Sequence, residues 1–273
     1  MNKQGLEMID ITGIDHSVLD RPEILLMLFY PREDYGEPVV LENIFDLLIP
    51  VEEGVELGAR FFIAGSDAPN ILFFHGNGEI VSDYNDMGAL YNEFNINFFP
   101  VDYRGYGRSN GSPTITSLIR DSHPIFKFVH TWLRENGHTG PLIVMGRSLG
   151  SAPALELIPH YQDHIDGLIV ESGFAGLNGL YANFGLEATE DQLNNLSNVL
   201  KIATFDKPSL IIHGENDTIV AFENGKSLFE ASIARGKRLL RVPGAGHNDL
   251  LAVALVPYME AVTELVDQAM MQQ

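Results

Sequence analysis

The sequence predicts an α/β fold with a mostly parallel central sheet, antiparallel strands at its N-terminal start, and helices on both faces. From Ile71 onward, nearly every short run of branched and aromatic residues is followed by a segment with helical spacing. Strands that alternate with helices need crossover connections, so such strands run parallel and are covered on both faces. Before Ile71, two apolar runs follow each other with little helix between them, which favours an antiparallel pair at the start of the same sheet.

Eight segments have the length and composition of strands, and we expect them at residues 47–49, 55–63, 71–75, 96–102, 142–145, 167–171, 209–213 and 238–242. Residues 172–207 break the alternation, with an apolar half beside an acidic, asparagine-rich half. The segment is too long for a plain connection, so we expect a small helical lid insertion there. We expect one domain over residues 1–273, with residues 1–50 as an N-terminal extension of unassigned role.

Composition narrows the classes of function. The chain of 273 residues carries 37 acidic and 17 basic side chains, a formal net charge of −20, and no cysteine. Disulfides, thiolate metal sites and a cysteine nucleophile are therefore excluded. The negative field disfavours nucleic acid and anionic membrane surfaces as partners. The first ten residues lack a basic stretch leading into an apolar one, and no apolar run approaches the roughly 20 residues of a transmembrane segment, so we expect a cytoplasmic enzyme.

The strongest local motif is Gly146-Arg147-Ser148-Leu149-Gly150, a G-x-S-x-G directly after an expected buried strand. A serine on a sharp strand-to-helix turn projects its hydroxyl above the sheet edge, and the glycines remove side chains that would collide there. The helix that follows points the free N–H groups of its first turn at the same place. The motif therefore predicts Ser148 as a nucleophile; the alternative is a tight glycine turn with a bystander serine.

A serine hydroxyl needs a base, and the base needs a carboxylate that orients it. His247 lies in a glycine-rich loop after the last expected strand, where it can be placed over the sheet edge. Asp217 follows the strand at 209–213 and is the favoured carboxylate. Glu215 in the same loop and Glu171 at the end of the preceding strand are its rivals, and a helix-capping role is the alternative for Asp217.

An oxyanion hole needs two backbone N–H groups directed at one point. One is expected from Leu149, the residue after the nucleophile. The other is expected from Asn77 in His75-Gly76-Asn77-Gly78, the loop after an earlier strand. His75 is expected to brace this loop rather than to take part in the chemistry.

These segments, together with the turn at 102–109 and the loop at 244–247, resemble the serial landmarks of the α/β-hydrolase superfamily over roughly residues 55–270. The order Ser148, Asp217, His247 is also the order of that family's triads. The resemblance is strongest to compact, small-lid serine hydrolases, the group that includes ABHD-type depalmitoylases and bacterial esterases. It implies the α/β-hydrolase fold and a carboxylic ester or thioester as substrate, either a small acyl compound or an acylated protein, without metal or organic cofactor.

The same motifs are compatible with other functions. A serine peptidase or amidase would use the same triad, and a non-catalytic binding protein would keep the scaffold alone. Gly105-x-Gly107 after a strand suggests a dinucleotide site, but the third glycine, Gly111, stands one position late. His160 and His164 have the spacing of a metal pair but lack the glutamate of H-E-x-x-H, so they are expected to be a surface pair.

Overall fold

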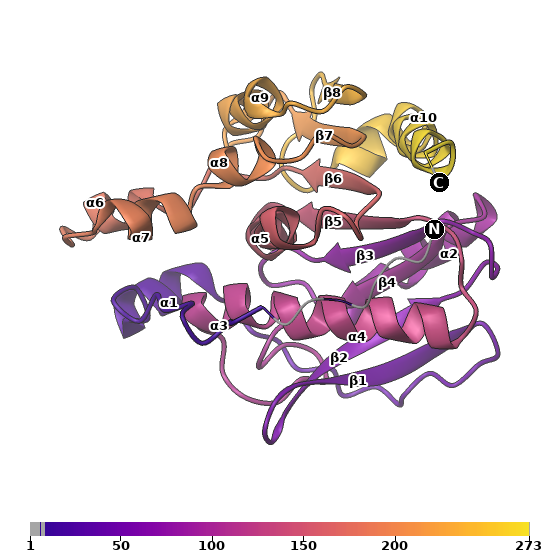
Figure 1. Cartoon of the computed structure of the whole chain (residues 1–273), viewed down its shortest axis with the longest axis horizontal. Helices are drawn as coiled ribbons and strands as arrows, with labels where there is room; N and C mark the ends of the chain where they lie inside the picture. The colour runs from indigo at the N-terminus through magenta and orange to yellow at the C-terminus, as the bar shows by residue number, and fades with distance from the viewer. Residues whose placement is uncertain (1–5, 7–8, 273) are drawn as a thin grey trace.

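The computed structural model describes residue 6 and residues 9–272, and its centre is an eight-stranded sheet with the spatial order β1-β2-β4-β3-β5-β6-β7-β8 (Figure 1). The strands are β1 (Ile44–Glu52), β2 (Val55–Phe62), β3 (Asn70–Phe74), β4 (Asn97–Val101), β5 (Leu142–Arg147), β6 (Gly167–Glu171), β7 (Ser209–Gly214) and β8 (Lys237–Val242). Each lies where the sequence predicts a strand. β1 pairs with β2, and β2 with β4, in antiparallel register, whereas all pairs from β4 to β8 are parallel. The predicted fold class is therefore confirmed.

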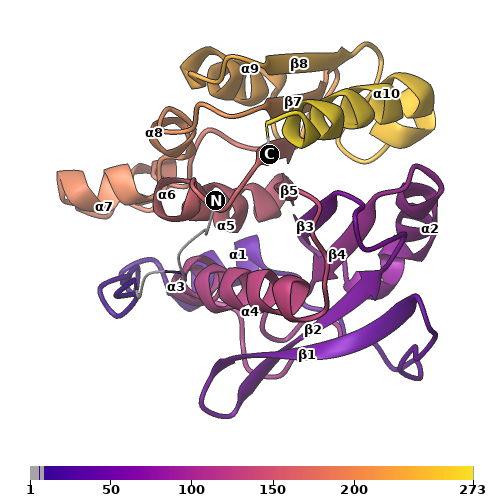
Figure 2. The same cartoon turned by 45° about the vertical axis from the view of Figure 1, so that its right-hand side comes forward.

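Side chains that alternate along the strands build one core on each face of the sheet. On one face, residues such as Leu72, Val144 and Val170 pack beneath α3 (Ile115–Arg120), α4 (Ser122–Glu135), α5 (Ser151–Tyr161), α8 (Asn198–Ile202) and α9 (Phe222–Ala231). On the other face, residues such as Phe73 and Met145 pack against α2 (Asn85–Glu93) and α10 (Leu250–Met270). Figure 1 and Figure 2 both show these two helices on the same side of the sheet. The five central parallel strands lack polar alternation because both of their faces are buried.

Three short helices lie beyond the carboxyl ends of the parallel strands, at the left of Figure 1. They are α1 (Pro22–Leu28), α6 (Gly179–Asn183) and α7 (Glu190–Asn195). With α8, the helices α6 and α7 occupy the segment in which the sequence predicts a helical insertion. Helix α1 was not expected. Pro22 lies in its first turn, where a proline costs no hydrogen bond, but seven residues give too few turns for a clear helical period.

The N-terminal segment is attached to the carboxyl edge of the sheet by backbone hydrogen bonds. The Gly107 N–H donates to the carbonyl of Arg32 at 2.7 Å, and the Asp34 N–H donates to the carbonyl of Gly107 at 3.0 Å. The Asp20 carboxylate accepts the N–H of Ile115 at 2.8 Å and so covers the first turn of α3. Part of the segment predicted as an extension thus contacts the loops that form the site. Among the described residues, no helix is both long and apolar enough to cross a bilayer.

Candidate active site

Ser148 lies at the end of β5, on the 3-10 turn η2 (Ser148–Gly150) that leads into α5. Its φ angle is +49°, in the left-handed region that non-glycine residues rarely adopt. The two glycines of the motif explain how this turn is held. A Cβ at Gly150 would overlap the carbonyl oxygen of Phe74, and one at Gly146 would overlap the carbonyl oxygen of Gly150. The backbone therefore packs too closely for a side chain at either position, and this packing keeps Ser148 in its strained conformation.

The structure brings Ser148, His247 and Asp217 together in one hydrogen-bonded chain. The Ser148 Oγ lies 2.9 Å from the His247 Nε2, and the His247 Nδ1 lies 2.7 Å from the Asp217 Oδ2. All three side chains are largely buried. With a proton on Nδ1 donated to Asp217, the Nε2 lone pair is directed at the serine hydroxyl, which is the arrangement that general-base activation requires.

Asp217 is held in place by its own loop. Its Oδ1 accepts the backbone N–H groups of Ile219 at 2.9 Å and of Val220 at 2.8 Å, which leaves Oδ2 for His247. His213, at the end of β7, lies with its Nε2 2.8 Å from the carbonyl of Val220 and 3.4 Å from the Asp217 Oδ2. Because this imidazole contacts both the carbonyl of Val220 and the carboxylate of Asp217, His213 helps to position Asp217. The sequence analysis does not single out this residue.

The two rival carboxylates have other partners. Glu215 forms an ion pair with Arg241 at the surface. Glu171 is buried and accepts hydrogen bonds from the Nε of Arg147 at 3.0 Å and from the hydroxyl of Tyr258 at 2.6 Å. Neither carboxylate is among the hydrogen-bond partners of His247 that the described residues provide, so the geometry favours Asp217.

Arg147, the variable residue of the G-x-S-x-G motif, connects three loops of the site. Its Nε binds Glu171, and its Nη1 forms an ion pair with Glu79 in the loop after β3. Its Nη2 donates to the backbone carbonyl of His247 at 3.0 Å and to the Oδ1 of Asn248 at 2.8 Å. Burial disfavours the charged guanidinium, but Glu171 and Glu79 outweigh it and hold the pKa of Arg147 above its ordinary value.

The sequence carries a signal for this residue, because a charged side chain at the end of an apolar, fully buried strand must have partners.

The loop after β3 lies directly against the nucleophile turn. Besides Phe74, the carbonyl of His75 lies within 2.8 Å of where a Gly150 Cβ would stand, so the two predicted donors of the oxyanion hole belong to loops in contact. The Glu79 carboxylate accepts the Gly76 N–H at 2.6 Å and fixes the start of this loop. The Asn77 Oδ1 accepts the N–H of Tyr30 at 2.9 Å. The side chain of Asn77 therefore binds the segment after α1.

His75 braces the loop after β3, as the sequence predicts, and the arginines of the following turn pair with carboxylates. His75 is fully buried, with its Nε2 3.3 Å from the Asp102 Oδ1 and its carbonyl accepting the hydroxyl of Tyr103 at 2.6 Å. Arg104 forms an ion pair with Asp121 at 2.6 Å.

Arg108 lies near the carboxylates of Asp34 and Asp46, at 3.6 and 3.5 Å. Both guanidinium groups of the turn, those of Arg104 and Arg108, therefore bind carboxylates, which gives the dinucleotide interpretation no support.

An apolar rim borders the residues of the site. Ile219, two residues after Asp217, is 67% exposed, and Tyr30, whose N–H contacts Asn77, is 62% exposed. In α1, Leu26 is 75% exposed. Ile219 and Tyr30 thus add exposed apolar surface next to residues of the site.

Comparison with known proteins identifies the family. A family model described as serine aminopeptidase S33 matches residues 66–203, about half of the chain. The chain is 32% identical over 202 residues to human α/β-hydrolase domain-containing protein 17B, and the match covers 72% of this chain and 66% of the human protein, just under two thirds of its length. Mouse α/β-hydrolase domain-containing protein 17C is 30% identical over 215 residues, covering 77% of this chain and 63% of the mouse protein.

Solved structures show the same fold. An esterase from Pyrococcus furiosus matches with a TM-score of 0.69 and 19% identity, covering 87% of this chain and 98% of the other. Est1E from Butyrivibrio proteoclasticus matches with a TM-score of 0.60 and 19% identity, covering 83% of this chain and 98% of the other. With the sequence matches and the observed topology, these findings show that the chain belongs to the α/β-hydrolase family.

Proposed function

We propose that this protein is a serine hydrolase that cleaves a carboxylic ester or thioester through an acyl-enzyme on Ser148. The observation that carries the proposal is the hydrogen-bonded chain from the Ser148 Oγ through His247 to Asp217, with distances of 2.9 and 2.7 Å. A nucleophile, a base and an orienting carboxylate in this sequence of contacts are what acyl transfer requires.

In the proposed reaction, His247 takes the proton of Ser148 as the hydroxyl oxygen attacks the substrate carbonyl. The charge that develops on the carbonyl oxygen is stabilised by the N–H groups of Leu149 and Asn77. His247 then donates the proton to the departing alcohol or thiol, which leaves an acyl ester on Ser148. A water molecule, activated by His247, hydrolyses this ester and regenerates the serine. The Asp217 carboxylate orients the imidazole and stabilises the imidazolium.

The substrate class is proposed from the apolar rim and the helical insertion. In the insertion, Leu177, Leu180 and Tyr181 are buried and belong to the same core as α5, whereas Tyr30 and Ile219 stand exposed next to residues of the site. An acyl chain is the part of a substrate that the two exposed side chains would bind. The α/β-hydrolase domain-containing relatives and the esterase-like structures support acyl-group hydrolysis, and the serine aminopeptidase description keeps an amide as the second candidate.

A fluorophosphonate probe tests the nucleophile. We expect the wild-type chain to be labelled and Ser148→Ala to be unlabelled. Ser172→Ala, which alters a buried serine at the end of the neighbouring strand, serves as the matched control and should keep its labelling. A folded wild type that takes up no probe would contradict the proposal and favour a binding protein on the hydrolase scaffold.

A set of substrates with one acyl group and different leaving groups tests the reaction. We expect turnover of the oxygen ester and thioester, with kcat/KM rising along a series of short to medium acyl chains. Cleavage of amides only would replace the esterase assignment with a peptidase or amidase. A flat profile over chain length would show that the rim does not bind the acyl chain.

A further inference from the structure

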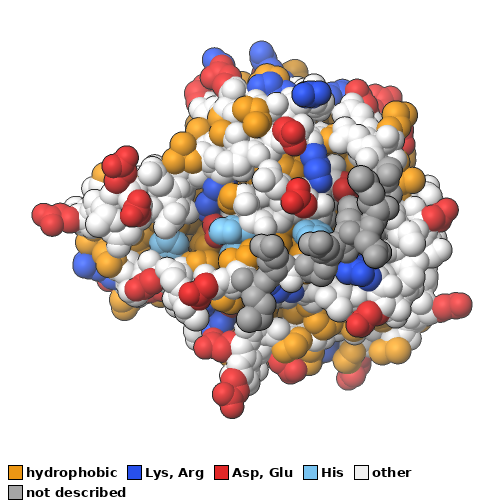
Figure 3. Space-filling view, viewed as in Figure 1, with side chains coloured by type: hydrophobic (Ala, Val, Ile, Leu, Met, Phe, Trp, Pro, Cys, Tyr) orange, Lys and Arg blue, Asp and Glu red, His pale blue; other side chains and the backbone are white. Residues whose placement is uncertain are grey.

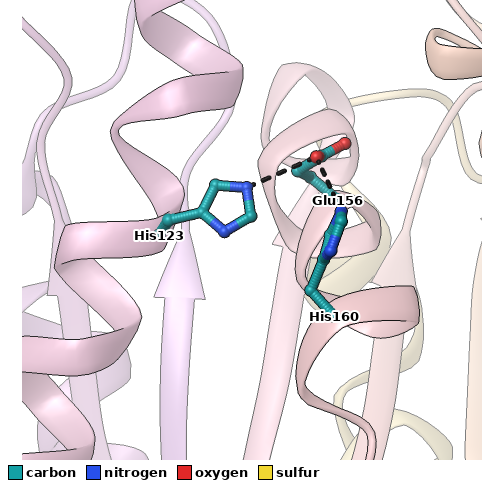
Figure 4. A group of neighbouring side chains, drawn as sticks. All are labelled: His123, Glu156 and His160. Atoms are coloured by element: carbon teal, nitrogen blue, oxygen red, sulfur yellow. Dashed lines mark hydrogen bonds and ion pairs between the residues drawn. The ribbon is translucent and has the colours of Figure 1, made fainter. Parts of the chain in front are cut away.

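A second cluster of chemically active side chains lies on the face of the sheet that carries α4 and α5. His123 on α4 and Glu156 and His160 on α5 have their ligand atoms within 4.8 Å of one another. Both imidazoles turn one nitrogen toward the same carboxylate, as Figure 4 shows. Histidine side chains are visible on the face of the molecule that Figure 3 shows. None of the three takes part in the proposed hydrolysis.

The distances in the cluster match those of a small tetrahedral metal site. The Nε2 of His123 and the Nε2 of His160 each lie 3.4 Å from the Glu156 Oε1. Bonds of about 2.0–2.1 Å from a tetrahedral Zn²⁺ place neighbouring ligand atoms about 3.3 Å apart. Two of the three ligand-to-ligand distances therefore already have the value that a bound ion would impose, and only the two imidazoles would need to approach each other.

Charge balance alone does not explain why two histidines meet at this carboxylate. The Nζ of Lys201 lies 2.6 Å from the Glu156 Oε2 and already neutralises the buried glutamate. The other oxygen, Oε1, is left for the two imidazoles. The carboxylate of Glu156 thus contacts one ammonium group through Oε2 and two imidazole nitrogens through Oε1.

The surroundings also fit a metal site. The Nδ1 of His123 lies 3.1 Å from the hydroxyl oxygen of Tyr161, a partner for the ring N–H that remains when Nε2 binds an ion. The His160 side chain is 38% exposed, which gives an ion access from solvent. Three groups oppose binding by adding positive charge near the cluster: the ammonium groups of Lys201 and Lys127 and, when protonated, the neighbouring His16.

We propose that His123, Glu156 and His160 form a binding site for one divalent transition-metal ion, with Zn²⁺ as the preferred ion and the fourth position open to water. Imidazole and carboxylate donors in tetrahedral arrangement are typical of zinc. The bound ion would join α4 to α5, the helix that begins three residues after Ser148. The expected consequence is a more stable α4–α5 pair, independent of whether the protein hydrolyses esters.

The test uses the full chain without an affinity tag, freed of metal by a chelator, and titrates it with Zn²⁺ in a calorimeter. We expect one ion per chain and a rise in Tm with zinc. Titration with Co²⁺ should give the intense visible absorption of a tetrahedral site. His160→Gln is the first variant because its side chain is half-exposed and its loss leaves the Glu156–Lys201 pair intact. It should weaken zinc binding at least about tenfold.

Two further variants distinguish this site from other histidines. His138→Gln alters a half-buried histidine that stacks on Trp132, outside the cluster, and should bind zinc like the wild type. His247→Gln should also keep the ion, because the proposed site lies away from the triad. Unchanged affinity in His160→Gln, or loss of the ion in His247→Gln, would overturn the proposal.

Discussion

Replacing Arg147 should lower both the stability of the protein and kcat, and each effect can be measured separately. The substitution Arg147→Met removes the guanidinium but keeps most of the apolar volume of the side chain. It leaves Glu171, with a side chain 5% exposed, and Glu79, 24% exposed, without their shared cation. It also removes the two hydrogen bonds that hold His247 and Asn248.

The size of the effect follows from this burial. Removing one partner of a buried ion pair destabilises a protein by about 3–5 kcal/mol. For a chain of this size, Tm changes by roughly 2–4 °C for each kcal/mol, so a fall of about 6–20 °C is expected. The loss of the bonds to the His247 loop should also lower kcat by about 10²-fold, the effect of a displacement of about 1 Å in a reacting group. This is far less than the loss expected on removing the nucleophile.

The assay measures the free energy of unfolding in urea and kcat at a temperature where the variant is folded. Arg147→Lys keeps the charge but cannot reach four partners, so it should recover stability more than kcat. The double variant Arg147→Met/Glu171→Gln should be more stable than the single variant, because one buried carboxylate no longer lacks a cation. A variant Arg147→Met with unchanged stability would refute the burial argument, and one with unchanged kcat would refute the positioning role.

Three other predictions concern Asp217, Gly150 and His123. Asp217→Asn should lower kcat by about 10⁴-fold in a steady-state assay, because the imidazole loses its orienting carboxylate, whereas Glu215→Gln should leave kcat unchanged. Gly150→Ala should prevent folding or lower Tm severely in a thermal melt, because its Cβ would overlap the backbone of Phe74. Burial lowers the pKa of His123 from its ordinary 6.5, so below pH 6.5 the unfolded chain gains a proton that the folded chain does not. The free energy of unfolding should therefore fall on acidification, by up to about 1.4 kcal/mol per pH unit for this group, and His123→Asn should reduce that slope in urea titrations.

The sheet could be predicted because its strands carry a local signal. Runs such as residues 142–145 and 209–213 are apolar throughout, and in a chain with helices between them this composition indicates parallel strands buried on both faces. The loops at the carboxyl ends of such strands must lie at one edge of the sheet. This rule predicts that the loops of Ser148, Asp217 and His247 lie together.

The features that escaped prediction depend on contacts between distant segments. Helix α1 is seven residues long, and the segment that follows it is held by the turn around Gly107, which is far from it in the sequence. The sequence predicts that His160 forms a surface pair with His164, because a spacing of four residues along one segment is visible in a sequence. The structure places His160 beside His123 instead, 37 positions earlier, and no periodicity connects two residues on different helices. Arg147 likewise gains its role from a carboxylate in the loop after β3 and another at the end of β6.

The conformation of Ser148 shows how the same residues serve the fold and the proposed chemistry. A serine with φ of +49° costs about 1–3 kcal/mol, and a free chain would relax to an ordinary conformation. Here the close packing of Gly146 and Gly150 leaves no room to relax, and the first turn of α5 begins at once. The strain therefore persists only while β3, β5 and α5 are packed together. Replacing either glycine should thus remove the reactive geometry and the fold in one step, whereas Ser148→Gly should stabilise the protein while abolishing probe labelling.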